Sequence, residues 1–488
     1  MKLYNYEKKY TIGTIILVLS IFVNMDKLKS QVIQSDFLFE TKNNNSLTKE
    51  EFAEKYALKA KDIKDFHPIN FDMHVLLHES KNPLINIDGN TLSLKKTKMT
   101  IKDQNSFSYF GIIDNNISNK AIITVRNGFA AGTFFLNSKE YNIITSKDMQ
   151  YYLLRVDNNS NCGNNSEGTE NIFPVIDKNT APVLKYTNVN SCNMRILVLY
   201  TPNAEAYFSD ILNSIEHVIN VANEYLGNSL VDETYELAYA GLTNYTEYTV
   251  GDGRYTDINR FRIDGDGHMD EVHDLRDKYS ADVCVLLSEC QSTIGQCGGI
   301  AATIDANTPS WAFCLVHAET WGAVPNRLFS HEIGHLLGCR HDNDGTSTPY
   351  TYGHGYHYIN GQTEFQTIRG TTWGIDYAPN FSNPDVYYNG LVTGTSNWND
   401  CGRVCELEIP EKVGFLQPEN NVSITSTDLS NVLYGDIISE QTVTIQNAAI
   451  TDGSVLIIRS DETTISSNFT VELGAELVIK NEAVHGCN

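Results

Sequence analysis

The pattern of hydrophobic and polar positions changes several times along the chain. Residues 31 to about 155 consist of short β-like runs separated by polar turns, as in AIITVRNGFAAGTFFLNSKEYNIIT (121–145). Runs of this kind predict a β-rich N-terminal region. The segment VDNNSNCGNNSEGTEN (156–171) has almost no hydrophobic residues and is rich in Asn, Ser and Gly, which indicates a linker.

Strands and helices alternate from residue 192 onward. The run CNMRILVLYT (192–201) is typical of a buried strand, and the apolar spacing of NSIEHVINVANEYLGNS (213–229) suits a helix. Further strands are expected at 234–248, 281–288 and 311–317, and a second helix at 268–280. This alternation predicts an α/β sandwich.

The pattern changes again at about Gln417. Short β-branched runs there are separated by Gly, Asn, Asp and Ser turns, which predicts a small all-β C-terminal module over 417–488. Its strand-turn ladder loosely resembles surface or secretion-associated modules of exported bacterial proteins.

The N-terminus has the features of a secretory signal peptide over residues 1–30. Lys2, Lys8 and Lys9 precede the apolar run TIGTIILVLSIFV (11–23). Thirteen residues are fewer than the roughly 20 that a membrane span needs. A short anchor is the alternative, and lipid attachment is disfavoured because no cysteine lies near the cleavage point. We therefore expect a secreted, extracellular or cell-surface protein without a membrane span in the mature chain.

Charge and cysteine content narrow the classes of partner. The net charge of −24 argues against nucleic acids and anionic membrane surfaces. In an oxidising compartment, ten cysteines predict disulfides. Eight lie in one block between Cys192 and Cys405, which suggests pairing within the block, whereas Cys162 and Cys487 lie outside it.

The stretch SHEIGHLLGCRHDND (330–344) carries the candidate chemistry. On a helix, His331 and His335 project from one face and can bind one ion. A turn at Gly338 can bring His341 back as a third nitrogen ligand. Three protein ligands leave a fourth position on Zn²⁺ for water, and Glu332 can then act as general base.

A surface cluster of histidines is the plain alternative. The five fixed positions of HExxHxxGxxH should match by chance in roughly one in several thousand chains of this length. Apolar Ile333, Leu336 and Leu337 also supply the buried face that an active-site helix needs. We therefore expect one catalytic Zn²⁺ held by His331, His335 and His341.

This stretch resembles the signature of the metzincin clan, and Asp342 after the third histidine resembles its adamalysin (reprolysin) branch. MRILVLYTPNA, GGIAAT and FSNPDVYYNG are similar to segments of bacterial reprolysin-like peptidases. The resemblance implies a metzincin-type catalytic domain over 191–416, with a twisted mixed sheet and an active-site helix, after a β-rich propeptide and linker over 31–190. It also implies an edge strand near Gly299–Thr303 that binds extended peptide, and a pocket wall near Phe381–Gly390.

One position departs from the family pattern. Metzincins carry a methionine in a turn beneath the zinc, whereas FQTIRGTTWG (365–374) places Arg369 there. An unpaired guanidinium beside Zn²⁺ would cost several kcal/mol, so we expect Arg369 to reach solvent or pair with a carboxylate such as Asp376.

Two further sites are weaker. Cys162 in the linker could occupy the open zinc position and keep a proform latent, as in relatives; a disulfide, for instance to Cys192, and a free thiol are the alternatives. The carboxylates of DGDG (264–267) could bind Ca²⁺, but they lack the spacing of an EF-hand, and a plain turn is the simpler interpretation. Cys401 and Cys405 could face a common partner such as Cys339.

Two functions follow from these observations. The first is a secreted zinc endopeptidase, made as a zymogen, that hydrolyses proteins or peptides. The second is a catalytically weak or inactive metzincin scaffold that serves as a surface adhesin, an interpretation that Arg369 favours. The intact Glu332 and three histidines favour the first, and nothing in the sequence indicates an oligomeric state.

Overall fold

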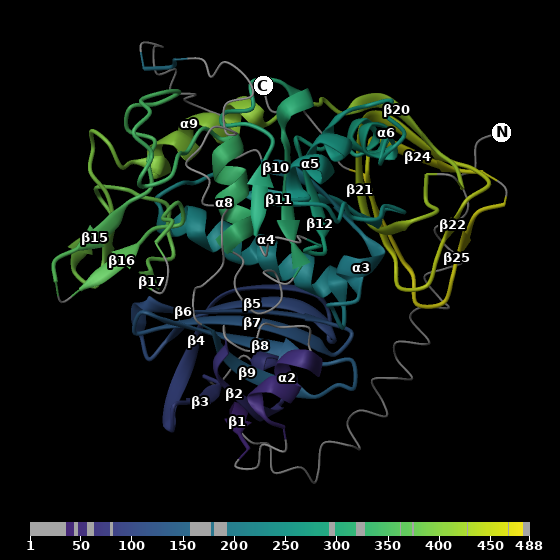
Figure 1. Cartoon of the computed structure of the whole chain (residues 1–488). Coiled ribbons are helices and arrows are strands. Elements are labelled where there is room, and N and C mark those ends of the chain that lie inside the picture. The colour runs from purple at the N-terminus through teal and green to yellow at the C-terminus, as the bar shows by residue number, and fades with distance from the viewer. Residues whose placement is uncertain are drawn as a thin grey trace, which may run out of the picture.

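The computed structural model describes residues 36–42, 47–55, 63–78, 82–156, 177–179, 193–291, 298–318, 327–361, 363–372, 375–426, 428–466 and 468–481. They form an N-terminal β-barrel, an α/β unit and a set of C-terminal strands, drawn in purple-blue, teal-green and yellow (Figure 1). The signal peptide expected over 1–30 lies outside the described residues, so it stays a prediction.

The N-terminal region is a closed nine-stranded barrel with strand order β1-β2-β9-β8-β7-β6-β5-β4-β3. Its strands are β1 (Phe37–Thr41), β2 (Ile63–Phe71), β3 (Leu84–Ile87), β4 (Asn90–Asp103), β5 (Ser106–Ile113), β6 (Asn116–Arg126), β7 (Phe129–Leu136), β8 (Lys139–Thr145) and β9 (Tyr151–Val156), with helix α2 (Lys49–Lys55) between β1 and β2. Asn127 and Gly128 join β6 to β7 with positive φ angles of 50° and 86°, as a tight primed hairpin turn requires. The β-rich region expected here is therefore a closed barrel, which leaves no open sheet edge.

The α/β unit is built on a mixed sheet in the order β13-β14-β12-β10-β11. The parallel strands are β10 (Met194–Tyr200), β11 (Tyr235–Leu242), β12 (Val283–Ser288) and β14 (Phe313–His317), and the short edge strand β13 (Gly299–Ala301) is antiparallel to β14. The four parallel strands lie within the ranges that the sequence predicts. The antiparallel edge makes the sheet mixed, as the family resemblance implies.

Helices cover both faces of this sheet. Alternate residues of β10 pack with α4 (Ile211–Asn228) and α8 (Arg327–Leu336) on one face, and with α5 (Arg254–Arg262) and α6 (Glu271–Lys278) on the other. The expected helices at 213–229 and 268–280 correspond to α4 and α6. The sequence did not indicate α5 or α9 (Cys401–Lys412), whose polar composition and internal Pro410 hide the helical period.

The remaining short elements lie in the loops. They are the 3-10 helices η2 (Met73–Leu77) and η3 (Pro309–Trp311), helix α3 (Pro202–Glu205), and strands β15 (His357–Ile359), β16 (Glu364–Gln366), β17 (Asp376–Tyr377), β18 (Tyr387–Tyr388) and β19 (Leu391–Val392).

The C-terminal strands continue the central sheet. Strand β21 (Val432–Ile445) pairs antiparallel with β11, and β23 (Val455–Arg459) and β26 (Glu476–Lys480) follow it in parallel. Strands β20 (Glu419–Ile424) and β24 (Glu462–Ile465) flank the second half of β21, and β22 (Ala449–Ile450) pairs with β25 (Thr470–Val471). The sequence predicted these strands as a module of their own; instead they cover the edge that β11 would otherwise expose.

The cysteines correct the expectation of pairing within the block. Cys290 is disulfide-bonded. Five others are reduced and fully buried: Cys284, Cys314, Cys339, Cys401 and Cys405. They fill apolar positions in the cores on the two faces of the sheet, where cysteine acts as a small hydrophobic residue.

The expected grouping of Cys401 and Cys405 with Cys339 is present. The Cys339 thiol lies 3.8 Å from the carbonyl oxygen of Cys401, and Cys405 hydrogen-bonds with Cys339. Cys162, Cys192, Cys297 and Cys487 lie outside the described residues.

The barrel docks on helix α4 through polar and apolar contacts. Ion pairs join Lys102 to Glu216, Lys120 to Glu224 and Arg126 to Asp210, the last at 2.8 Å. Barrel residues Ile122 and Phe135 also belong to the hydrophobic core of the α/β unit. Among the described residues, no helix is long and apolar enough to cross a membrane.

His217 lies at the centre of this interface. Its ring is hydrogen-bonded on one side to the hydroxyl of Thr124 at 3.1 Å and on the other to that of Thr133 at 2.9 Å. Burial lowers the pKa of His217 to about 3, so the docked state holds the neutral ring. An undocked or unfolded chain would take up a proton near the ordinary pKa of about 6.5.

We expect acid to weaken the docked structure through His217. The contribution of the neutral ring to the free energy of unfolding is complete above pH 6.5. It is lost as the pH falls towards 3, by at most about 1.4 kcal/mol per pH unit. Urea unfolding of wild type and His217→Gln at pH 7.5 and 4.5 measures this. Between pH 7.5 and pH 4.5 the free energy of unfolding of wild type should fall more than that of His217→Gln. An equal difference between the two proteins at both pH values would contradict the assignment.

Candidate metal centre and active site

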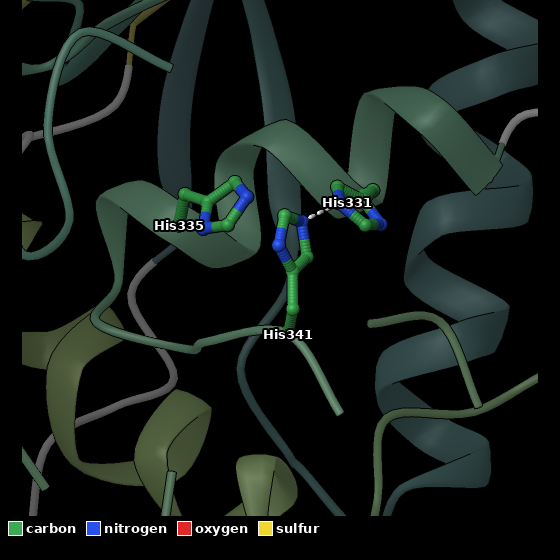
Figure 2. Close-up of side chains that lie close together, drawn as sticks. All are labelled: His331, His335 and His341. Carbon is green, nitrogen blue, oxygen red and sulfur yellow. Dashed lines mark hydrogen bonds between the residues drawn. The ribbon is translucent and has the colours of Figure 1, made fainter. Parts of the chain in front are cut away.

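Three histidines converge at the end of helix α8. His331 and His335 project from one face of the helix, which ends after Leu336. Gly338 then takes the left-handed conformation, with φ of 104°, and a Cβ at this position would lie 3.0 Å from Pro349. The chain turns back there, and His341 points at the other two rings from below the helix (Figure 2).

The geometry of the triad suits a metal ion. One nitrogen of each ring lies within 4.8 Å of the others, and the Nε2 atoms of His331 and His341 are 3.2 Å apart. His331 Nδ1 donates to the carbonyl of Ile368 at 2.8 Å, and His335 Nδ1 donates to that of Cys339 at 3.0 Å. These bonds favour the tautomers of His331 and His335 in which Nδ1 carries the proton and Nε2 can act as the metal ligand.

Electrostatics also favour the ligand form of the imidazoles. Burial lowers the pKa of all three rings well below the ordinary value, and the positive charge of Arg369 lowers it further. The rings are therefore neutral at neutral pH, as metal ligation requires. Three neutral nitrogen donors around one point fit a catalytic zinc site with an open fourth position.

Glu332 lies beside the triad and against the sheet edge. Its side chain is fully buried, and a Cβ added to Gly299 of β13 would lie 2.5 Å from its Oε1. Gly299 is thus the residue that leaves room for the carboxylate. The sequence contained this glycine in GGIAAT, but the need for glycine appears only when β13 is placed beside α8.

Strand β13 is the last strand of the sheet, and no described strand pairs with its outer side. It overlaps the edge strand that the resemblance implies near Gly299–Thr303. An extended peptide could pair with this outer side by main-chain hydrogen bonds. The wall implied near Phe381–Gly390 stays a prediction; Phe381 is buried and lies against Gly334 of α8.

The expectation for Arg369 was wrong. The residue is fully buried, and its guanidinium bonds to a main-chain carbonyl and an imidazole of the described residues instead of Asp376 or solvent. Its Nη1 donates to the carbonyl of His331 at 2.7 Å, and its Nη2 contacts both ring nitrogens of His335. The carbonyl of an active-site helix residue and a neutral imidazole thus replace the expected carboxylate.

Asp342 supports the site from behind. Its Oδ1 accepts from the backbone N–H and the hydroxyl of Thr371, at 3.0 and 2.9 Å. Its own N–H donates to the carbonyl of Arg369 at 3.3 Å. These bonds tie the loop that carries His341 to the segment beneath the triad.

The candidate Ca²⁺ site in DGDG does not have the geometry of a metal site. In DGDG the N–H groups of Gly265 and Gly267 donate to the carboxylate of Asp270, at 2.9 and 3.1 Å, as in a plain turn. Among the described residues, the histidine triad is the one group of His, Cys and acidic side chains arranged to hold a metal. Cys162 lies outside the described residues, and its role as a latency ligand stays a prediction.

Comparison with known proteins agrees with this site. A family model described as Metallo-peptidase family M12 (Reprolysin_5) matches residues 190–372. Fold and site therefore define a metzincin-type zinc metallopeptidase.

Curated relatives have one name in common. A peptidyl-Asp metalloendopeptidase of Stenotrophomonas maltophilia (strain K279a) is 33% identical over 48% of this chain and 55% of its own. Proteins of the same name from Xanthomonas campestris pv. campestris and Pseudomonas fragi are 28% and 30% identical, over 66% and 32% of this chain and 78% and 77% of their own. The chain belongs to the reprolysin-like M12 metallopeptidases, and it spans about half the length of the Stenotrophomonas relative.

We expect Gly299→Ala to displace Glu332 without removing the metal ligands. The added methyl group would lie 2.5 Å from Oε1, so the carboxylate has to move. A displacement of about 1 Å can cost on the order of 100-fold in rate. Peptide hydrolysis should fall by at least about tenfold at unchanged zinc content, whereas Gly345→Ala, where nothing lies within 4 Å, should match wild type. Full activity of Gly299→Ala would refute this placement of Glu332.

Arg369→Met should fold and should bind zinc at least as tightly as wild type. The gain in zinc affinity should be up to about tenfold, because a cation in contact with His335 is removed. Competition with a chelating dye measures the affinity. Turnover should change modestly. A wild type without zinc or activity, both restored by Arg369→Met, would instead identify a disabled scaffold.

Proposed function

We propose that this protein is a secreted zinc endopeptidase made as a zymogen. The observation that carries the proposal is the convergence of three buried histidines, two on α8 and one after the turn at Gly338, beside the buried Glu332 that packs against edge strand β13. His331, His335 and His341 would hold the metal through Nε2. The chemistry that zinc supplies when bound is Lewis acidity, which polarises a carbonyl and lowers the pKa of water.

Residues of the chain bind the substrate and transfer the proton. Substrate in extended form pairs with the outer side of β13, which lays a peptide bond across the triad. Glu332 accepts a proton from the attacking water and delivers it to the leaving amine. Burial of Glu332 and the histidines excludes bulk water, which strengthens these electrostatic interactions.

The barrel is the proposed propeptide. It packs on α4 through buried polar contacts such as those of His217. The chain between β9 and β10, which contains Cys162, is where we place the latency ligand and the processing site. Secretion and the zymogen therefore form one proposal, in which the barrel folds with the enzyme and is cleaved off after export.

The shared name of the relatives suggests the substrate. Those proteins are named peptidyl-Asp metalloendopeptidases, and we extend to this chain a preference for peptide bonds next to aspartate.

A scaffold without catalysis is the second candidate. The observation in its favour is the buried guanidinium of Arg369 against His335. Such a protein would use its surfaces for adhesion and would bind zinc weakly.

Glu332→Ala separates the two candidates. The variant keeps all three ligands, so zinc content should equal that of wild type, while the loss of the general base should slow casein hydrolysis by roughly 10² to 10⁴. Zinc analysis and casein cleavage measure the two effects. Glu364→Ala removes a partly exposed carboxylate at the start of β16; it is the control and should keep wild-type activity. Equal hydrolysis by wild type and Glu332→Ala would end the zinc-peptidase proposal.

A further inference from the structure

Four charged side chains form a cluster beside the turn at Gly338. Asp305, Glu408 and Lys412 are each only 2% exposed. The ammonium group of Lys412 lies 3.0 Å from Asp305 and also pairs with Glu408. The ammonium group of Lys178 lies 3.0 Å from the same oxygen of Asp305 and 2.7 Å from Glu408. We call these four residues the Lys178 cluster; its two positive and two negative charges balance.

Lys178 comes from the part of the chain that the sequence assigns to the propeptide and linker, residues 31–190. It also precedes residues 190–372, which the family model matches. Neither boundary predicts a contact with the peptidase. Both carboxylates that pair with Lys178 nevertheless belong to the α/β unit, and Glu408 lies on α9.

The main chain around Lys178 is bound to the same unit. The N–H group of Lys178 donates to the carbonyl of Pro349 at 2.9 Å. Asn179 Nδ2 donates to the carbonyl of Ser347 at 2.9 Å. Asn179 Oδ1 accepts from the N–H group and the hydroxyl of Thr351, at 2.6 and 2.5 Å. The segment therefore holds the loop that contains Pro349 at three residues.

These contacts reach the turn on which the metal site depends. A Cβ on Gly338 would lie 3.0 Å from Pro349 and 3.6 Å from Asp305. The N–H group of Asp305 also donates to the carbonyl of His335 at 2.8 Å. Lys178 thus binds both residues against which the turn packs, Pro349 through its main chain and Asp305 through its ammonium group.

Without Lys178 the cluster would have one net negative charge in a buried place. Removal of one partner from a buried ion pair leaves an uncompensated charge and is strongly destabilising. Both ammonium groups bond to Oδ1 of Asp305, and its Oδ2 has no hydrogen-bond partner among the described residues. The hydroxyl of Tyr350 donates to Glu408. The carboxylate of Asp305 therefore depends on the two lysines.

We propose that residues 177–179 stay with the peptidase when the propeptide is removed, and that Lys178 is a positioning residue for the Gly338 turn. The inference rests on the proposed zymogen function. Release of the barrel breaks its contacts with α4 and none of the contacts of the Lys178 cluster described above. Loss of Lys178 would instead place an unpaired charge beside the turn that returns His341 to the metal.

The first test locates the start of the processed chain. Zinc-loaded protein is purified from a secreting host in its native state, and its mass is then measured under denaturing conditions. The processed chain should still contain Lys178, because the residue is bound by the peptidase. An active form that lacks residues 177–179 overturns the inference.

The second test removes the ammonium group from the full chain. Lys178→Met should lower Tm by at least about 5 °C and zinc affinity by about tenfold, measured by thermal unfolding and by competition with a chelating dye. Lys178→Met/Glu408→Gln removes one charge of each sign, so it should recover most of both losses. Lys139→Met is the control and should match wild type, because Lys139 pairs with Asp88 at 3.6 Å on the exposed surface.

Lys178→Arg keeps the charge, and its zinc affinity should stay within about threefold of wild type. If Lys178→Met does not fold, recovery of folding by Glu408→Gln decides the charge argument. Wild-type Tm and zinc affinity in Lys178→Met, or a double variant less stable than Lys178→Met, overturns the inference. Neither measurement needs catalysis, so a wild type that holds zinc and cleaves nothing counts against the peptidase proposal alone.

Discussion

The left-handed turn at Gly338 is the constraint on which the metal site depends. A helix can direct only two histidines of this spacing at one ion, so the third must return from outside the helix. Gly338 makes the return possible through its φ of 104°, and Pro349 would lie only 3.0 Å from a Cβ there. Asp342 then holds the returning loop against Thr371. Ligands, base and supporting loop all follow from that one change in chain direction.

The sequence predicted the parts of the site that depend on local spacing. His331, His335 and Glu332 follow from helical periodicity, and the turn expected at Gly338 predicted His341 as the third ligand. Contacts between segments distant in sequence were not accessible in this way. The room that Gly299 leaves for Glu332 depends on β13 lying against α8, and the contact of Arg369 with His335 depends on how the segment beneath the triad folds.

The same division holds for the fold. Hydrophobic patterning found the strands of the central sheet, because their residues are buried on both faces, but it missed polar α5 and α9. Pattern alone assigns strands, not their partners. The barrel closure and the pairing of β21 with β11 are long-range events of this kind. The buried cysteines illustrate it as well, since the compartment suggests disulfides while their places in the apolar cores hold them apart as thiols.

The pairing of β21 with β11 has a practical consequence for anyone who expresses this protein in pieces. A fragment trimmed to the segment that the family model matches, residues 190–372, would lack α9 and every strand from β17 onward. Its β11 would then present a row of unsatisfied main-chain groups from Tyr239 to Gly241, where β21 now pairs. Such an edge recruits strands from other molecules. The folded unit therefore includes the C-terminal strands, and the boundary of sequence similarity is not the boundary of that unit.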